Sequence, residues 1–327
     1  MQHWSIIGHT TIVRQLERAV MQAEVPHALL ITGPENVGKS TLALTLAQAL
    51  LCSHAEQRPC GRCSVCRRVA SGNHPDLLVV APEEEGQAVK IDQIREVEHY
   101  LRLTPAETRY KIAIIFNFDE ATVGAANALL KTLEEPPPYA HLILLARDAD
   151  NLLPTIVSRT RLLPLRPLDI DTIARGLQER WNVPEERARQ LARLSGGRLG
   201  WAVTATTQPQ QMEQMERAIE LLFEVLRSDL PTRFALAQEL AKDDTLLAQT
   251  LEYWRRAWRD VLLLQSGSAQ HIIHREQEQA LQRIAEQGDV PTTDRLLRAL
   301  EGSLDSLRRH ANTRLLVESL FLELPYL

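Results

Sequence analysis

The chain has 327 residues, more than one hydrophobic core normally organises, so two or three domains are expected. Its 37 basic and 42 acidic residues give a net charge of −5, which argues against a protein that grips nucleic acid by itself. No apolar run approaches the roughly 20 residues of a membrane span. The first residues also lack the basic and apolar regions of a signal peptide, so we expect a cytoplasmic protein with no membrane partner.

The first half of the chain alternates short apolar runs with helical patterns. Continuous apolar character, typical of strands buried on both faces of a parallel sheet, marks residues 28–31, 77–80, 112–116 and 142–145. Helical spacing predicts helices over residues 12–23, 40–51 and 92–103. Strands that alternate with helices in this way predict an α/β fold with a parallel sheet.

The pattern changes in the middle of the chain. We interpret residues 164–167, which begin and end with proline, as a connector. Amphipathic patterns predict two short helices over residues 169–181 and 185–194, and the second is ended by residues 195–197 (SGG). The polar residues 204–211 are interpreted as a linker to the last part of the chain.

Beyond the linker the chain shows only helical periodicity. The pattern predicts helices over residues 212–227, 232–241, 246–264, 272–287 and 292–321. Trp254 and Trp258 lie four residues apart beside several arginines, so they either stack on nucleic acid or pack inside a helical domain. Packing is the favoured interpretation, because this spacing places both rings on one helix face.

A phosphate-binding motif lies between the first predicted strand and the next helix. The pattern G-x-x-x-x-G-K-[ST] matches residues 33–40, which read GPENVGKS. Gly33 and Gly38 let the backbone curl so that its N–H groups face a phosphate. Lys39 is expected to reach the β and γ phosphates of ATP, and Ser40 to hold Mg²⁺, with Thr41 beside them. The alternative is a glycine turn with a surface lysine.

All four cysteines fall in one short segment that follows this helix. Cys52, Cys60, Cys63 and Cys66 offer four thiolates in a cytoplasmic chain, where a metal is favoured over disulfides. Zinc prefers four soft ligands in a tetrahedron, and C-x₂-C spacing lets a tight knuckle supply two of them. We therefore expect a structural zinc site. Four unliganded thiols and an iron–sulfur cluster are the alternatives.

Later motifs carry a family resemblance. Residues 127–137 (NALLKTLEEPP) and 158–160 (SRT) are similar to the N-A-L-L-K-x-L-E-E-P-P and S-R-C motifs of AAA+ clamp-loader subunits of bacterial DNA polymerase III. A zinc module after the phosphate-loop helix resembles the gamma and delta-prime subunits, and residues 74–76 (HPD) resemble delta-prime chains. These landmarks span residues 5–205 in the family's order.

The resemblance implies a fold and an assembly. It implies an AAA+ P-loop nucleotide-binding domain over residues 1–166 with an inserted zinc module at about 52–66, a helical lid domain over 167–206, and an all-α collar domain over 207–327. The implied partners are gamma/tau and delta subunits, with the sliding clamp and primer-template DNA reached through the assembly. The S-R-C arginine of this family enters a neighbour's ATP site, and that position is Arg159 here.

The sequence departs from active members of this family at the acidic motif. Counted back from Asn127, the D-E-x-D positions fall on residues 116–119, so Phe116 and Asn117 replace both catalytic carboxylates. Phenylalanine cannot coordinate Mg²⁺, and asparagine cannot act as a general base. A shift of three residues onto Asp119 and Glu120 is the alternative, although it places them past the strand end.

A second departure lies in the predicted lid. Active loaders carry a γ-phosphate-sensing arginine there, and by spacing that position is Gly200 or Trp201. Together the departures predict a stator that hydrolyses ATP weakly or not at all and donates Arg159 to a neighbour. Whether it binds ATP with Mg²⁺ stays open. A catalytically active ATPase of the gamma/tau type is the alternative function.

Overall fold

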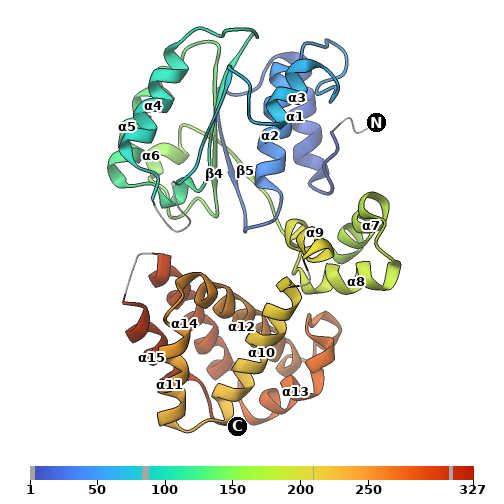
Figure 1. The fold of residues 1–327 in the computed structure, drawn as a ribbon, viewed down its shortest axis with the longest axis vertical. Helices are drawn as coiled ribbons and strands as arrows, with labels where there is room; N and C mark the ends of the chain where they lie inside the picture. Colours follow the sequence, from blue (N-terminus) through green and yellow to red (C-terminus); the bar gives the residue numbers. More distant parts are fainter. Residues whose placement is uncertain (1–3, 83–87, 209, 309–311) are drawn as a thin grey trace. The chain divides into compact units, whose positions relative to one another are not determined.

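The computed structural model describes residues 4–82, 88–208, 210–308 and 312–327. The chain divides into two compact units, Met1–Val203 and Thr204–Leu327, whose folds are drawn in Figure 1. Within the described residues, no helix is both long enough and apolar enough to cross a membrane.

A five-stranded parallel sheet organises the first unit. Its order is β2-β3-β4-β1-β5, and the strands are β1 (Ala28–Thr32), β2 (Leu77–Val80), β3 (Lys111–Ile115), β4 (Ala140–Ala146) and β5 (Arg161–Pro164). Every residue of β1, β3 and β4 is buried, as expected for strands covered on both faces. The predicted α/β fold with a parallel sheet is therefore confirmed.

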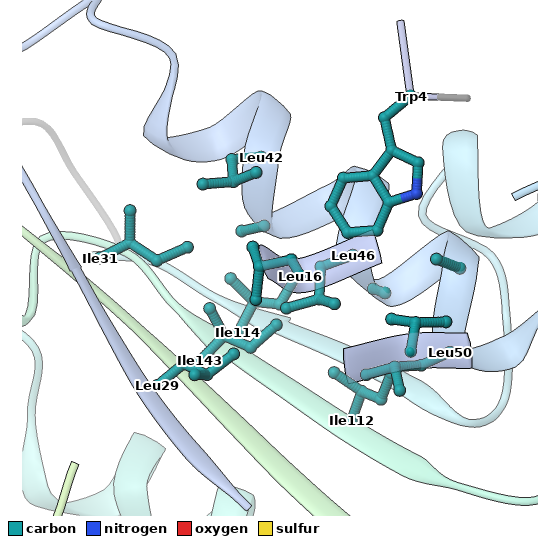
Figure 2. Close-up of a cluster of buried hydrophobic side chains, with 14 of the residues drawn as sticks. Trp4, Leu16, Leu29, Ile31, Leu42, Leu46, Leu50, Ile112, Ile114 and Ile143 are labelled. Atoms are coloured by element: carbon teal, nitrogen blue, oxygen red, sulfur yellow. The ribbon is translucent and has the colours of Figure 1, made fainter. Parts of the chain in front are cut away.

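Helices cover both faces of this sheet (Figure 1). One face carries α1 (Thr10–Gln22), α2 (Lys39–Leu51) and α3 (Ser64–Ala70), and the other carries α4 (Ile91–Arg102), α5 (Val123–Glu134) and α6 (Pro154–Val157). Alternate strand side chains enter the two cores. Leu29 and Ile31 join the cluster under α2, whereas Leu30 joins the cluster under α5. Figure 2 shows the first cluster, in which strand residues meet Leu16, Leu42, Leu46 and Leu50.

Strand β5 was not predicted. Its last residue, Pro164, falls in the connector that was expected at 164–167. Among the described strands β5 pairs with β1 alone, at the edge of the sheet, and Leu163 is its one buried side chain. A strand this short and exposed leaves no clear apolar pattern. Pro164, which has no N–H to donate, is tolerated at such an edge.

Three helices follow the sheet: α7 (Ile170–Trp181), α8 (Glu185–Leu194) and α9 (Leu199–Thr207). The first two match the predicted helices. The expected linker at 204–211 is wrong in part, because α9 continues to Thr207 and the next helix begins at Gln210. The threonines of α9 suggested a loop, but Trp201, Ala202 and Ala205 are buried and give the helix a packed side.

The second unit is entirely helical in its described residues. Its elements are α10 (Gln210–Arg227), α11 (Leu230–Leu240), α12 (Asp244–Gln265), α13 (Glu278–Gln287), α14 (Val290–Arg308) and α15 (Thr313–Glu323), with short 3-10 turns at Ala269–His271 and Arg275–Gln277. Trp254 is fully buried, and its indole N–H donates to the Ala218 carbonyl at 2.7 Å. Trp258 is also buried, so both tryptophans pack the core, as predicted.

Two predicted helices of this unit were too long. The helix expected over 292–321 is two helices, because the Asn312 side chain accepts the Leu315 N–H at 3.1 Å and begins a new one. The helix expected over 272–287 begins only at Glu278. Before it, buried Asp260 accepts hydrogen bonds from the N–H groups of Ile273 and His274, both at 2.9 Å. These two N–H groups therefore bond to a side chain and not to the backbone carbonyls of a helix.

Candidate functional site

The phosphate-loop motif lies where the sheet reverses its winding. β1 continues into α2 on one face, whereas its neighbour β4 continues into α6 on the other face (Figure 1). Chain segments that leave adjacent strands toward opposite faces open a crevice at the carboxyl ends of those strands, which is where open α/β sheets bind ligands. The Gly33 N–H donates to the Arg147 carbonyl at 2.9 Å and fastens the loop to the end of β4.

The loop geometry depends on its glycines. Gly33 has φ of 146°, and a Cβ there would lie 2.4 Å from the Leu165 carbonyl oxygen. Gly38 has φ of 113° and is the N-cap of α2, so Lys39 is the first residue of that helix. The Lys39 ammonium donates to the Gly33 and Pro34 carbonyls at 2.5 and 3.0 Å. The lysine therefore lies over its own loop.

The two hydroxyl residues of the predicted set follow directly. Ser40 and Thr41 are exposed in the first turn of α2, where N–H groups have no partner inside the helix and the helix dipole favours an anion. His9 also touches the loop, since its Nε2 lies 3.1 Å from the Val37 carbonyl and donates to it. Burial lowers the pKa of His9, so this ring is neutral near pH 7. His9 belongs to no motif found in the sequence, so its contact with the loop was not predicted.

A charge cluster surrounds the lysine. Burial lowers the pKa of Lys39, while the carboxylates of Glu35 and Asp119 raise it and Arg147 lowers it. The Arg147 guanidinium forms ion pairs with Glu35 at 2.6 Å and with Glu120 at 3.2 Å. Arg147 lies outside every motif found in the sequence. Its only signal was a position two residues after the strand predicted over 142–145, toward the ligand-facing edge of the sheet.

The residues at the first two acidic-motif positions, Phe116 and Asn117, are not carboxylates, and their surroundings differ. Phe116 packs against the core cluster on the α2 side. Asn117 is exposed, has φ of 49°, and its amide lies 3.4 Å from a Glu120 oxygen. Asp119 and Glu120 lie past the strand end in a 3-10 turn at Phe118–Glu120, and burial raises the pKa of both.

The lid position expected to sense phosphate contacts the loop through its backbone. The Gly200 N–H donates to the Asn36 carbonyl at 2.8 Å. A Cβ on Gly200 would lie 3.0 Å from that same oxygen, so the close approach depends on glycine. Trp201 is only 3% exposed. Neither position carries a cationic side chain.

The four cysteines converge as their spacing predicted. The sulfur atoms of Cys52, Cys60, Cys63 and Cys66 all lie within 4.8 Å of one another. The Cys63 and Cys66 N–H groups donate to the sulfurs of Cys60 and Cys63 at 3.4 and 3.3 Å. Burial opposes ionisation of Cys63, but the hydrogen bond from the Cys66 N–H and neighbouring side chains lower the pKa of its thiol to about 6. Burial raises the pKa of Cys66.

Arg159 lies on a different part of the first unit, just after α6. One of its terminal nitrogens forms an ion pair with Glu134 at 2.7 Å, and the other donates to the Thr155 carbonyl at 3.0 Å. About a third of its side chain, 36%, is exposed. Both terminal nitrogens thus have partners within the chain, while part of the side chain is exposed.

Comparisons with known proteins show which family the chain resembles. A family model described as "DNA polymerase III, delta subunit" matches residues 8–169. The chain is 31% identical over 318 residues to DNA polymerase III subunit delta' of Bacillus subtilis (strain 168), which covers 96% of this chain and 95% of that protein.

Other relatives extend the similarity. DNA polymerase III subunit delta' of Yersinia pestis is 29% identical over 281 residues, or 84% of this chain and 81% of that protein. DNA polymerase III subunit tau of Bacillus subtilis is 34% identical over 156 residues, or 47% of this chain and 27% of that protein. The match to the Bacillus delta' subunit runs through both compact units. The chain therefore belongs to the family of DNA polymerase III delta' subunits.

Proposed function

We propose that this chain is a clamp-loader subunit that acts as a stator. It assembles with gamma/tau and delta subunits, helps to load the sliding clamp on primed DNA, and supplies Arg159 to a neighbour's ATP site without turning over ATP itself. The observation that carries this proposal is the carboxyl end of β3, where Phe116 and Asn117 stand in place of two catalytic carboxylates.

Hydrolysis of ATP needs a group that orders Mg²⁺ and one that orients or deprotonates water. The Phe116 ring packs on the core, and the Asn117 amide has no basic lone pair to accept a proton. Glu120 is close, but its carboxylate is engaged by Arg147. These contacts support a site with little catalytic power.

Binding of nucleotide requires fewer groups than hydrolysis. The backbone N–H groups of residues 33–39 and the start of α2 would hold the phosphates, Lys39 would neutralise them, and Ser40 would reach Mg²⁺. These residues would balance the negative charge of the triphosphate of bound ATP. The lid adds the Gly200–Asn36 hydrogen bond but no cation to detect a γ-phosphate. The site therefore suits a nucleotide that is bound without a cationic side chain to detect its γ-phosphate.

The cysteine cluster is proposed to hold one structural zinc ion. With Zn–S bonds of about 2.3 Å, tetrahedral sulfurs lie roughly 3.8 Å apart. Cys60 and Cys66 are separated by 4.0 Å, which fits that geometry. The hydrogen bonds from N–H groups to Cys60 and Cys63 favour thiolates, the form that binds metal. Four cysteine ligands leave no open position, so the ion would be structural.

The role proposed for Arg159 follows from its chemistry and exposure. A guanidinium stays charged, and its planar donors match the oxygens of a transferring phosphoryl group. The Arg159 side chain is partly exposed, on the side of the sheet that carries α5 and α6. A neighbouring subunit can therefore reach it without rearrangement of the core.

ATP turnover by the purified chain tests the missing activity. We expect no turnover above a Lys39→Ala variant of the same chain, with or without primed DNA. Robust DNA-stimulated hydrolysis that disappears in Lys39→Ala would contradict the stator proposal.

One observation favours the gamma/tau-type alternative, because the charge of Asp119 acts on Lys39 from past the strand end. An active ATPase would use this carboxylate to order Mg²⁺. If turnover is found and Asp119→Asn abolishes it, the shifted acidic motif is the functional one. If turnover is absent, Asp119→Asn should change nothing.

A further inference from the structure

The partner of Arg159 within this chain has no assigned role. Glu134 is the last residue of α5, and its carboxylate lies 2.7 Å from an Arg159 terminal nitrogen. The two residues are 25 positions apart in the sequence, so the contact depends on how α5 and α6 pack. Both helices contribute to one core, through Leu133 on α5 and Ile156 on α6.

The location of Glu134 is electrostatically unfavourable without a cation nearby. The carboxyl end of a helix carries partial negative charge, which repels a carboxylate. Glu134 and Glu135 both occupy that end of α5, and the prolines at 136 and 137 prevent the helix from continuing. Arg159 offsets this repulsion at Glu134. A residue that serves only helix formation would not be acidic at this point.

The contact fixes the guanidinium while leaving donors available. Arginine has five N–H donors in a rigid plane. Glu134 takes one terminal nitrogen and the Thr155 carbonyl takes the other, at 2.7 and 3.0 Å, so two anchors set the plane of the group. The nitrogen that meets Thr155 also lies 3.4 Å from the Ser158 hydroxyl oxygen, and the N–H groups left without a partner among the described residues remain for an incoming phosphate. Since 36% of the Arg159 side chain is exposed, an approaching subunit meets an oriented group.

An exposed ion pair adds little to folding stability, because solvent screens it and both side chains lose freedom. Its effect on a reaction can be larger, since a catalytic group that is already oriented needs no ordering when the sites meet. The Glu134–Arg159 contact is therefore better suited to orientation than to stability.

We propose that Glu134 is the positioning residue for Arg159, holding the guanidinium in the orientation that enters the neighbour's ATP site. The inference rests on the proposed function, because it presumes that Arg159 acts in trans. Glu134 itself touches no nucleotide. Its influence passes only through Arg159.

The test is steady-state ATP hydrolysis by the complete clamp loader assembled with variants of this chain. Glu134→Gln keeps the shape but removes the charge, and we expect kcat to fall about tenfold with KM for ATP unchanged. Glu134→Asp keeps the charge and should recover part of the loss. Glu135→Gln is the matched control, since Glu135 forms no ion pair among the described residues, and it should retain full activity.

A double variant separates positioning from a general structural effect. In a loader that carries Arg159→Ala, adding Glu134→Gln should cause no further loss, because the group that Glu134 orients is gone. A further loss would overturn the proposal. Thermal melting of each variant chain, expected to match the unmodified chain, shows that the fold is kept.

The two proposals fail in different ways. If Arg159→Ala leaves the loader fully active, the trans role of Arg159 is wrong and the proposed function fails. If Arg159→Ala lowers activity but Glu134→Gln behaves like the unmodified chain, the function stands and the positioning role of Glu134 is wrong. Equal losses in Glu134→Gln and Glu134→Asp would also contradict a role for the carboxylate charge.

Discussion

Asp76 carries its charge with none of its surface exposed, and its partners explain why that is tolerated. Its carboxylate accepts the N–H groups of Ala106, Glu107 and Thr108 at 2.6, 3.0 and 2.9 Å, and lies 3.6 Å from the Lys111 ammonium. These contacts fasten the loop before β3 to the start of β2. The HPD motif thus has a structural role at its aspartate, which its resemblance to delta-prime chains did not reveal.

Replacing Asp76 by asparagine should destabilise the first unit by about 3 kcal/mol, because a buried cation loses its counter-ion and N–H groups lose a charged acceptor. Burial raises the pKa of Asp76, but hydrogen bonds from the loop outweigh it and lower the pKa below its ordinary value. The carboxylate therefore stabilises the fold above about pH 4, and this contribution is lost as pH falls through its folded-state pKa.

Urea unfolding at pH 7 and pH 3 measures this effect. The difference in unfolding free energy between the unmodified chain and Asp76→Asn should narrow at pH 3. Asp92→Asn is the control. Asp92 is exposed and, among the described residues, pairs with Arg95 alone, so this change should alter stability by less than about 0.5 kcal/mol. A difference that is the same at both pH values would be inconsistent with a buried, ionised Asp76.

Residues whose roles follow from local spacing were predictable, and residues that act across the fold were not. The phosphate loop and the cysteines belong to compact motifs, so their convergence needed no knowledge of the fold. Arg147 and Glu134 act through partners 25 or more positions away, and Gly200 through contact with Asn36. Nothing in the order of residues shows such pairings.

At the scale of elements, the cysteine segment combines a cluster of four thiols with the short helix α3. Val65 and Val69 of α3 are buried in the core shared with α2, so apolar packing holds this helix against the domain. The loop of residues 52–63, in contrast, contributes few buried side chains. We expect the metal to order this loop.

Metal analysis should find about one zinc ion per chain in protein purified under reducing conditions. Cys63→Ser should lower the zinc content, because a hydroxyl is a poor substitute for a thiolate ligand. Hydrogen exchange over residues 52–63 should accelerate in that variant and after chelation. Ser64→Ala, one residue on, removes no ligand and should keep full zinc. Zinc well below one ion per chain in the unmodified protein would contradict the assignment.

Helix α9 depends on glycine where it meets the phosphate loop. A Cβ on Gly200 would lie 3.0 Å from the Asn36 carbonyl oxygen, which is backbone and cannot move aside as a side chain can. Gly200→Ala should therefore weaken the Gly200–Asn36 hydrogen bond and lower the unfolding free energy by about 1 kcal/mol.

The matched control is Gly124→Ala in the first turn of α5. A Cβ there would lie 3.7 Å from an Ile91 methyl, an ordinary contact, and alanine favours the helix by up to about 1 kcal/mol. Urea unfolding should thus shift in opposite directions for the two variants. Equal stabilities would mean that the lid contact does not require glycine.

At the scale of the whole molecule, fold class was readable from the sequence because buried parallel strands and amphipathic helices leave strong periodic patterns. The order of the strands in the sheet could not be read from the sequence. β1 pairs with β4 and β5, which are distant in the chain, and periodic patterns do not show which strands become neighbours. The second unit was predicted to be helical, but the starts of two helices were not. The Asn312 side chain caps α15, and Asp260 holds the N–H groups of Ile273 and His274 in the segment before α13. Domain limits at 166 and 206 stay predictions.

The two units contribute different parts of the proposed function. The first, Met1–Val203, contains the phosphate loop, the cysteine cluster and Arg159, and the second, Thr204–Leu327, is a helical body with a tryptophan-rich core. A stator needs a stable platform and one group that reaches a neighbour. Its own nucleotide site is then dispensable for turnover, while the group that it donates is not.

The most direct test compares Lys39→Ala with Arg159→Ala in this chain, each assembled with its partners into the complete clamp loader. Steady-state ATP hydrolysis is the measurement. We predict that Lys39→Ala leaves the rate within about twofold, whereas Arg159→Ala lowers it at least about tenfold, as loss of an arginine finger does. The opposite pattern, with Lys39 required and Arg159 dispensable, would contradict the account and make this chain an ATPase in its own right.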